Sequence, residues 1–445
     1  MTAFLLSLAR VGAVALTASA LGWVICGAFL PRGPAFRLER LGWSFGVAFA
    51  LLAAFVPLSF LAHERPGWGA FLVLCALAVA AGVECRVSSV ERNGSSTQLD
   101  PRPSTLDSLL RFVLLGFVAI GVTLYALRAL TEPMWANDFL AIWGFKGKTI
   151  FALGAVPSRL FESPALGFSH PEYPLGLPFL YAGASFLTGR WDDHALALLF
   201  PLFQIATLAV LAGWLRRRGA SLTVTLLASA LVASFEPLYS GFLTGMAEVP
   251  LSFGLILFGT ALADALDGEQ AGALRRLAFA SALVAATKNE GLFFAAAGCV
   301  SALLLGARRR WRVALAALPT ALVIHGLHLA WRGQLPLRDF DLTTFSLARV
   351  GEALAAAARV AGPPGWLSLG LVAALIALGS RRSDGDRLLL LAACGLAAYL
   401  ILPAFAVRGP AWLVEATLLR TTAGLVPLLA AAVAVRFGPQ HRGAD

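Results

Sequence analysis

Long apolar runs, separated by short polar segments, recur along almost the whole chain. A helix needs about 20 apolar residues to cross a bilayer, and fewer when other helices surround it. On this basis the pattern predicts spans at 3–30, 41–62, 67–84, 107–130, 194–215, 220–237, 249–266, 275–289, 291–307, 311–331, 365–380, 388–407 and 418–436. We therefore expect an all-α polytopic membrane protein, a bundle of about 13 transmembrane helices.

The composition supports a membrane protein. Of the 445 residues, 58% are hydrophobic and only 13% are charged, whereas a soluble domain has roughly 25% charged residues. The net charge of +10 comes mostly from arginines in short loops, which indicates orientation in a membrane and not nucleic-acid binding. The five cysteines form no C-x-x-C pair, so we expect no disulfide framework and no metal site. The expected partner is therefore a lipid bilayer and not a nucleic acid.

Basic residues in short loops also predict the sidedness, because they favour the cytoplasmic side. Most of the 35 Lys and Arg residues fall on one side if segment 88–106 is cytoplasmic. The polar segment 131–193 then faces outward, provided that 173–187 enters the membrane and returns. We expect a multi-pass protein of the cytoplasmic (inner) membrane with a cytoplasmic tail at 437–445.

Segment 88–106 divides the chain. It is rich in Ser, Asn, Gly and Pro, which is typical of a flexible linker. It separates three N-terminal spans, within 1–87, from a larger unit at 107–436. No strong internal repeat is visible in the sequence, which weakens an inverted-repeat transporter interpretation.

The polar segment 131–193 holds the first candidate site residues. Asp138 lies in WANDFLAIWGFKGK, where a partly desolvated carboxylate could accept a proton from a hydroxyl group. Asn137 or Asp138 could equally cap an interfacial helix that runs to about Phe151. Lys146 follows on that helix and could hold a phosphate, or could simply extend toward water.

A proline-rich stretch, HPEYPLGLP, follows in the same segment. Its prolines fix an extended entry into the membrane, which would place His170 and Tyr173 on a rigid support near a reacting bond. An exposed histidine without function is the plainer alternative.

Three further candidates lie near span ends. Glu248, in GMAEVP, could position a substrate or could complement a helix dipole. Lys288 and Glu290, in TKNEGL, form either a structural pair or a site in which Lys288 binds an anionic headgroup, since charges between two apolar runs are costly unless paired or functional. All three lie outside the polar segment 131–193.

Arg420 opens the last predicted span on the outward side, where the positive-inside bias gives no reason for a basic residue. Its guanidinium is suited to two parallel hydrogen bonds with a phosphate. Anchoring to ordinary lipid phosphates is the alternative.

The order of these features resembles the GT-C superfamily of integral membrane glycosyltransferases. Within it, the sequence is most similar to glycosyltransferase family 39, which includes dolichyl-phosphate-mannose protein mannosyltransferases and lipid A aminoarabinose transferases. The stretches that carry the resemblance are WANDFLAIWGFKGK, HPEYPLGLPFLYA, GMAEVP, TKNEGL and LLRTTAGLVP, within residues 107–436. The resemblance implies that 107–436 is a catalytic transmembrane module with an outer loop at 131–193, and that 1–87 lies outside it.

The resemblance also implies roles for the site residues. Asp138 would activate or orient the acceptor, while Lys288 and Arg420 would neutralise the phosphate of a polyprenyl-phosphate-linked sugar donor. Glu248 would match a second outer acid of the family, and His170 with Tyr173 would line the cleft between donor and acceptor. No cofactor or metal is implied, and the acceptor could be a glycan, a lipid or a protein. The alternatives are a transporter or flippase of a lipid-linked or anionic solute, and a non-catalytic assembly subunit.

Overall fold

The computed structural model describes residues 2–27, 30, 36–84, 104–157, 164–267, 272–305, 310–332, 342–360 and 384–437. Helices make up 84% of the structure, and its described part contains no strand, which confirms the all-α prediction. The predicted span 365–380, nearly all of the linker 88–106 and nearly all of the tail 437–445 lie outside the described residues.

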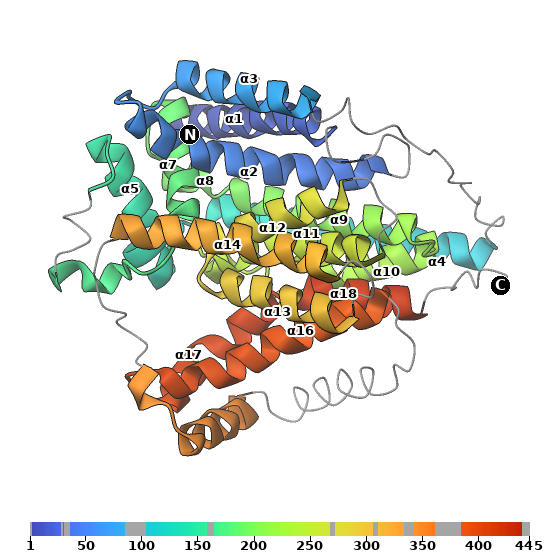
Figure 1. Cartoon of the computed structure of the whole chain (residues 1–445). Coiled ribbons are helices and arrows are strands. Elements are labelled where there is room, and N and C mark those ends of the chain that lie inside the picture. Colours follow the sequence, from blue (N-terminus) through green and yellow to red (C-terminus); the bar gives the residue numbers. More distant parts are fainter. Residues whose placement is uncertain are drawn as a thin grey trace.

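The helices run roughly parallel and antiparallel in one bundle (Figure 1). In chain order they are α1 (Thr2–Cys26), α2 (Arg37–Leu61), α3 (Trp68–Glu84), α4 (Thr105–Thr131), the π-helix η2 (Phe139–Trp143), α5 (Gly144–Leu153), η3 (Pro164–Ser169), α7 (Gly176–Thr188), α8 (Asp193–Leu196), α9 (Leu199–Arg217), α10 (Leu222–Ala233), η4 (Gly241–Leu243), α11 (Glu248–Asp267), α12 (Ala273–Thr287), α13 (Glu290–Leu305), α14 (Arg310–Arg332), η5 (Leu342–Thr344), α16 (Asp384–Ile401), η6 (Leu402–Phe405), α17 (Pro410–Ala423) and α18 (Val426–Phe437). A further helix covers 347–360.

Seven of the described helices are long and apolar enough to cross a membrane, or eight if the bent pair α17 and α18 counts as one span. Thirteen spans are therefore too many for the described residues. The helices α3, α10 and α13 are apolar but short, and α12 has only 15 residues with Arg275 and Arg276 near its start. A run of apolar residues indicates only that a helix avoids water. A helix that is buried inside a bundle avoids water without crossing the whole membrane.

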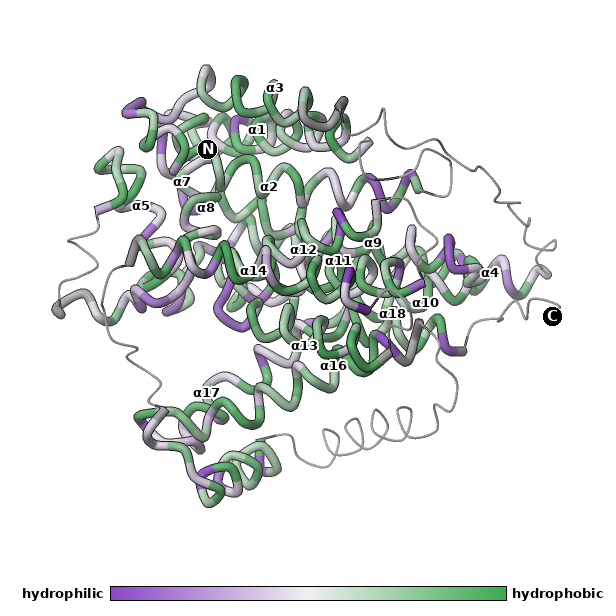
Figure 2. The backbone as a smooth tube through the Cα atoms, in the orientation of Figure 1, coloured by the Kyte–Doolittle hydropathy of each residue, from purple (hydrophilic) through white to green (hydrophobic). Residues whose placement is uncertain are grey.

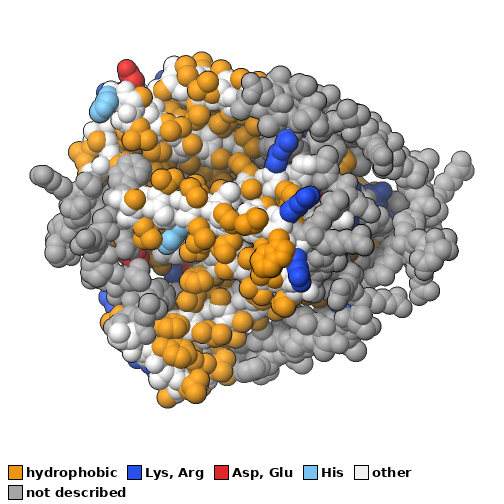
Figure 3. Space-filling model, in the orientation of Figure 1, with side chains coloured by type: hydrophobic (Ala, Val, Ile, Leu, Met, Phe, Trp, Pro, Cys, Tyr) orange, Lys and Arg blue, Asp and Glu red, His pale blue; other side chains and the backbone are white. Residues whose placement is uncertain are grey.

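On the face that Figure 3 shows, the described surface between the two ends of the bundle is largely apolar, as expected of helices that face lipid. Helix α4 exposes further apolar side chains, among them Phe112, Phe117 and Ile120. Hydrophilic residues gather mainly toward the two ends (Figure 2). This distribution, together with the long apolar helices, indicates a multi-pass membrane protein.

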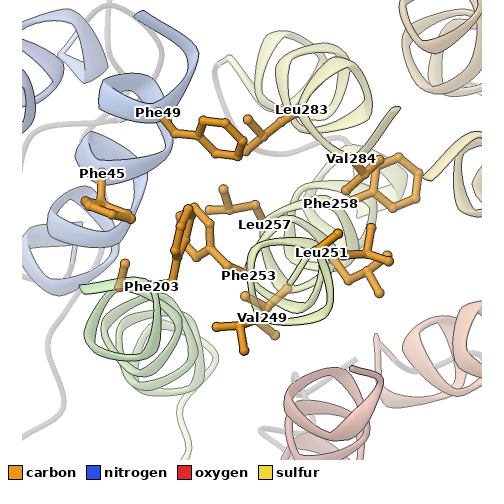
Figure 4. Packing of buried hydrophobic residues seen from close by; sticks show 14 of the residues in the cluster. Phe45, Phe49, Phe203, Val249, Leu251, Phe253, Leu257, Phe258, Leu283 and Val284 are labelled. Carbon is orange, nitrogen blue, oxygen red and sulfur yellow. The ribbon is translucent and has the colours of Figure 1, made fainter. Parts of the chain in front are cut away.

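Helix α11 is the central element, since 94% of its most apolar stretch is buried within the protein. Phe253 on α11 packs against Phe203 of α9, with ring centroids 5.6 Å apart. Phe45 and Phe49 of α2 reach the same ring of Phe203 at 4.9 and 5.6 Å (Figure 4). The edge-on geometry of these last two pairs is favourable for aromatic rings, and it joins the N-terminal helix α2 to the core around α11.

A network of charged side chains lies at the C-terminal end of α11. Asp264, which is 1% exposed, accepts hydrogen bonds from Arg217, Arg218 and Arg276 at 2.7 to 2.9 Å. Arg217 also binds Glu39 of α2 at 2.7 Å. Asp267 extends the network by binding Arg218 and Arg387. These contacts tie α2, α9, α11, α12 and α16 together.

We predict that Asp264→Asn destabilises the protein strongly. The change removes one partner of buried arginines, which typically costs about 3–5 kcal/mol. The melting temperature of the detergent-purified protein should fall by several degrees, whereas Glu236→Gln, at a carboxylate that is 64% exposed, should leave it unchanged. An equal melting temperature for Asp264→Asn and the wild type would contradict a stabilising role.

Candidate functional site

Five ionisable side chains from distant parts of the chain meet at the other end of α11. We call them the loop-side cluster: Asp138, Glu248, Lys288, Glu290 and Arg420. Arg420 Nη1 donates to Asp138 Oδ2 at 2.7 Å. Lys288 Nζ lies 2.8 Å from Glu290 Oε1 and 3.3 Å from Glu248 Oε1. The structure thus joins all five sequence-predicted residues into one chain of ion pairs.

Glu248 occupies the middle of this cluster. Its Oε1 atom contacts Lys288 Nζ at 3.3 Å and also Arg420 Nε at 3.5 Å. The side chain of Glu248 is only 2% exposed and that of Lys288 is 5% exposed. One buried carboxylate oxygen therefore holds two cations next to each other, which their mutual repulsion would otherwise oppose.

The outer pair of the cluster is more accessible. The side chains of Arg420 and Asp138 are 21% and 26% exposed to solvent. Water therefore reaches Asp138 and Arg420 more freely than Glu248 and Lys288.

Local backbone geometry sets these positions. Gly245, three residues before Glu248, has φ +95°, a conformation that favours glycine, and its carbonyl accepts a hydrogen bond from the Tyr181 hydroxyl at 2.9 Å. The break between α12 and α13 requires Gly291, because a Cβ atom there would lie 1.9 Å from the carbonyl oxygen of Val284. These two glycines allow the ends of α11, α12 and α13 to present Glu248, Lys288 and Glu290 together.

Asp138 lies at the start of the helix that was expected to follow it. That helix begins at Asn137 and passes through the π-helix η2, in which the N–H of Gly144 binds the carbonyl of Phe139, five residues earlier, before α5 ends at Leu153. Asp138 makes no side-chain capping bond to η2, and its carboxylate binds Arg420 instead. The capping alternative therefore does not apply to Asp138.

Lys146 and His170 form a second group beside the cluster. Lys146, which is fully buried, donates from Nζ to the carbonyl oxygen of His170 at 2.5 Å. Burial lowers the pKa of Lys146 to about 7, although the charge of Glu172 acts in the opposite direction. His170 Nδ1 lies 2.8 Å from Glu172 Oε1.

The backbone at His170 is strained. Its φ is +49°, which is uncommon for a residue other than glycine and costs free energy that the surrounding contacts must offset. The Lys146 ammonium on its carbonyl group and the Glu172 carboxylate on its ring are such contacts. Strained residues of this kind concentrate at functional sites.

Tyr173 lies between the two groups. Its ring centroid is 5.2 Å from that of Trp143 and 5.3 Å from that of His170. Burial raises the pKa of Tyr173 well above its usual value, and the charges of Glu290 and Asp138 raise it further. All eight residues selected from the sequence thus belong to one region of the structure.

Sequence analysis missed several polar groups of this region as site residues. Glu172 pairs with His170, and its backbone carbonyl lies 3.2 Å from His328 Nε2 on α14. Two histidines three residues apart in an apolar span, His325 and His328, were the available signal. Several buried polar atoms of the region have no hydrogen-bond partner: Trp143 Nε1, Glu172 Oε2, Glu248 Oε2, Asn289 Oδ1, Glu290 Oε2, Tyr399 OH and Arg420 Nε.

Acidic and basic side chains are equal in number in this group. The acids are Asp138, Glu172, Glu248 and Glu290, and the basic side chains are Lys146, His170, Lys288 and Arg420. Buried polar groups are normally hydrogen-bonded, so the unpartnered atoms suit a polar ligand. Within the described residues, no group of three or more His, Cys, Asp or Glu side chains is arranged to hold a metal ion.

No protein-family model, curated protein or solved structure matches this chain. The function must therefore be argued from the site itself.

We predict that the stability of the protein depends on pH through Lys146. A lysine in an unfolded chain has a pKa of 10.5, and in the folded protein that of Lys146 is about 7. Between these values the unfolded chain binds more protons, so folding becomes more favourable as the pH rises from 7 toward 10. The melting temperature of the wild type should rise relative to that of Lys146→Met over this range.

The exposed Lys148 on the same helix provides the control. The difference between the wild type and Lys148→Met should not change with pH. A difference between the wild type and Lys146→Met that is equally independent of pH would refute the shifted titration.

Proposed function

We propose that this protein is a membrane glycosyltransferase that moves a sugar from a polyprenyl-phosphate donor to an acceptor on the outer face of the cytoplasmic membrane. The observation that supports this most directly is the cluster in which Asp138, Lys288 and Arg420 meet around Glu248. One candidate base and two candidate phosphate-binding cations are thereby close enough to act on a single donor–acceptor pair. The order of the sequence motifs, which resembles glycosyltransferase family 39, agrees with this proposal.

The reaction assigns a different task to each kind of side chain. An acceptor hydroxyl attacks the anomeric carbon of the donor, and its proton passes to the Asp138 carboxylate. The bond between the anomeric carbon and the phosphate oxygen breaks, and its electron pair stays on the phosphate. The products are the glycosylated acceptor and a polyprenyl phosphate. A general base of this kind typically contributes about 10²- to 10⁴-fold to the rate.

Lys288 and Arg420 meet the negative charge that develops on the departing phosphate. Lys288 is nearly inaccessible to water and Arg420 is largely buried, so their charges are weakly screened and act more strongly than in water. Glu248 keeps both cations in place before the substrate arrives. Because the cations are positioned in advance, little reorganisation is needed during the reaction.

The second group of residues suits the sugar. Tyr173 is partly exposed and its ring packs on the buried ring of Trp143, while the buried Glu172 holds the ring of His170. His170 lies against Tyr173 and is 21% exposed. Tyr173 and His170 orient the sugar and the acceptor beside Asp138, so that binding aligns the reacting atoms.

The first test is the turnover of lipid-linked sugars by Asp138→Asn. Purified protein is reconstituted in vesicles with a native extract of polyprenyl-phosphate sugars and acceptor membranes, and release of polyprenyl phosphate is followed by mass spectrometry. We expect the wild type to release it, and Asp138→Asn to do so at least about 100-fold more slowly.

The matched control is Glu415→Gln, on α17, whose carboxylate is 53% exposed and, within the described part of the chain, forms an ion pair with Arg359. It should keep the wild-type rate. Full activity in a correctly inserted Asp138→Asn variant would exclude Asp138 as the base. Movement of the lipid across the vesicle membrane without any release of polyprenyl phosphate would favour a transporter instead.

A second test changes the geometry of the cation at position 420 and keeps its charge. Arg420→Lys preserves a positive charge but removes the fork that binds two phosphate oxygens at once. We expect kcat/KM for the donor to fall roughly 10- to 100-fold, equivalent to the loss of about 1.4 to 2.7 kcal/mol. An unchanged kcat/KM would show that the guanidinium does not contact the phosphate.

A further inference from the structure

The cations proposed to bind the donor are already occupied by carboxylates. Arg420 Nη1 is bound to Asp138, and Lys288 Nζ is bound to Glu290 and to Glu248. An anionic ligand must therefore compete with carboxylates of the protein itself. Which carboxylate yields depends on its burial and on its other contacts.

Asp138 and Glu248 differ in both respects. Glu248 is 2% exposed and holds two cations through one oxygen, so a ligand that displaced it would leave a buried carboxylate unpaired, which is costly. Asp138 is 26% exposed and, among the described residues, has one ion-pair contact, so it can be hydrated when it leaves Arg420. Exchange at Asp138 is thus the less costly of the two.

We propose that a phosphate group enters this site by replacing Asp138 on Arg420, and that this replacement releases the Asp138 carboxylate for its work on the acceptor. Glu248 stays in place and holds Arg420 beside Lys288 throughout. This inference rests on the proposed function and adds an order of events, in which donor binding precedes activation of the base.

The exchange links two properties of the site. While Asp138 is bound to Arg420, its Oδ2 atom is engaged by the guanidinium and is not available to an acceptor hydroxyl. Once a phosphate takes Arg420, this oxygen is released and can accept a hydrogen bond from the hydroxyl. The base is therefore available when the donor is present, which limits proton transfer to the occupied site.

Binding of a short polyprenyl phosphate tests the exchange without any turnover. Farnesyl phosphate is titrated into the detergent-purified protein by calorimetry. Because Asp138→Asn removes the competing carboxylate, we expect this variant to bind farnesyl phosphate roughly three- to tenfold more tightly than the wild type. A residue that merely contacted the ligand would give weaker binding when replaced.

A double-mutant cycle separates competition at Arg420 from a general effect of charge. In an Arg420→Gln background no guanidinium remains to be released, so Asp138→Asn should no longer tighten binding. Glu132→Gln removes the same charge from an exposed position on the same loop and should leave the affinity for farnesyl phosphate unchanged. Equal tightening by Asp138→Asn with and without Arg420 would overturn the exchange.

The ligand series separates this inference from the function on which it rests. If farnesyl phosphate binds the wild type and Asp138→Asn equally well, the exchange is refuted and the proposed function stands. If it binds neither protein, both are refuted. If inorganic phosphate shows the same tightening and the farnesyl chain adds no affinity, exchange at Arg420 is supported and a lipid-borne donor is not. Farnesol, which lacks the phosphate, should bind both proteins equally.

Discussion

A carboxylate is buried at each end of α11, and a separate set of charged side chains is arranged around each of them. A buried ion is strongly unfavourable unless other charges and hydrogen bonds compensate it. Asp264 draws Arg217, Arg218 and Arg276 toward one end, while Glu248 draws Lys288 and Arg420 toward the other. A helix of 20 residues is about 30 Å long, so the two groups are well separated. The core helix thus carries one group that joins helices and one that offers chemistry.

The sequence predicted the helices better than the way in which they cross the membrane. Apolar runs mark buried or lipid-facing helices, but they do not distinguish a crossing from a short helix packed inside the bundle, such as α12. They also miss bends: the predicted span 418–436 contains the junction of α17 and α18, where the axis turns by 48°. Helix α7 lies in the segment expected to enter the membrane and is wholly buried, because its neighbours α2 and α5 cover it.

The candidate site was predicted as a set of residues but not as a set of pairs. Position along the chain was enough to select all three main candidates: Asp138 in a polar segment after a span, Lys288 between two short apolar runs, and Arg420 at the start of the last predicted span. Their partners depend on contacts between residues far apart in sequence, since Arg420 and Asp138 are 282 positions apart. Glu172 was passed over because nothing in its local sequence indicates that it would hold a strained histidine.

The π-helix after Asp138 fixes how this part of the site is aligned. A π-turn holds one residue more than an α-turn, so η2 rotates every later side chain of the same helix relative to Asp138. Lys146 reaches the carbonyl of His170 from a helix face that depends on this rotation. A regular α-helix over the same number of residues would turn the lysine by about 100°, whereas a chain with one residue fewer and no π-turn would keep its direction. The combination of interval length and π-turn, more than the identity of the residues within it, should therefore mark chains that share the same site.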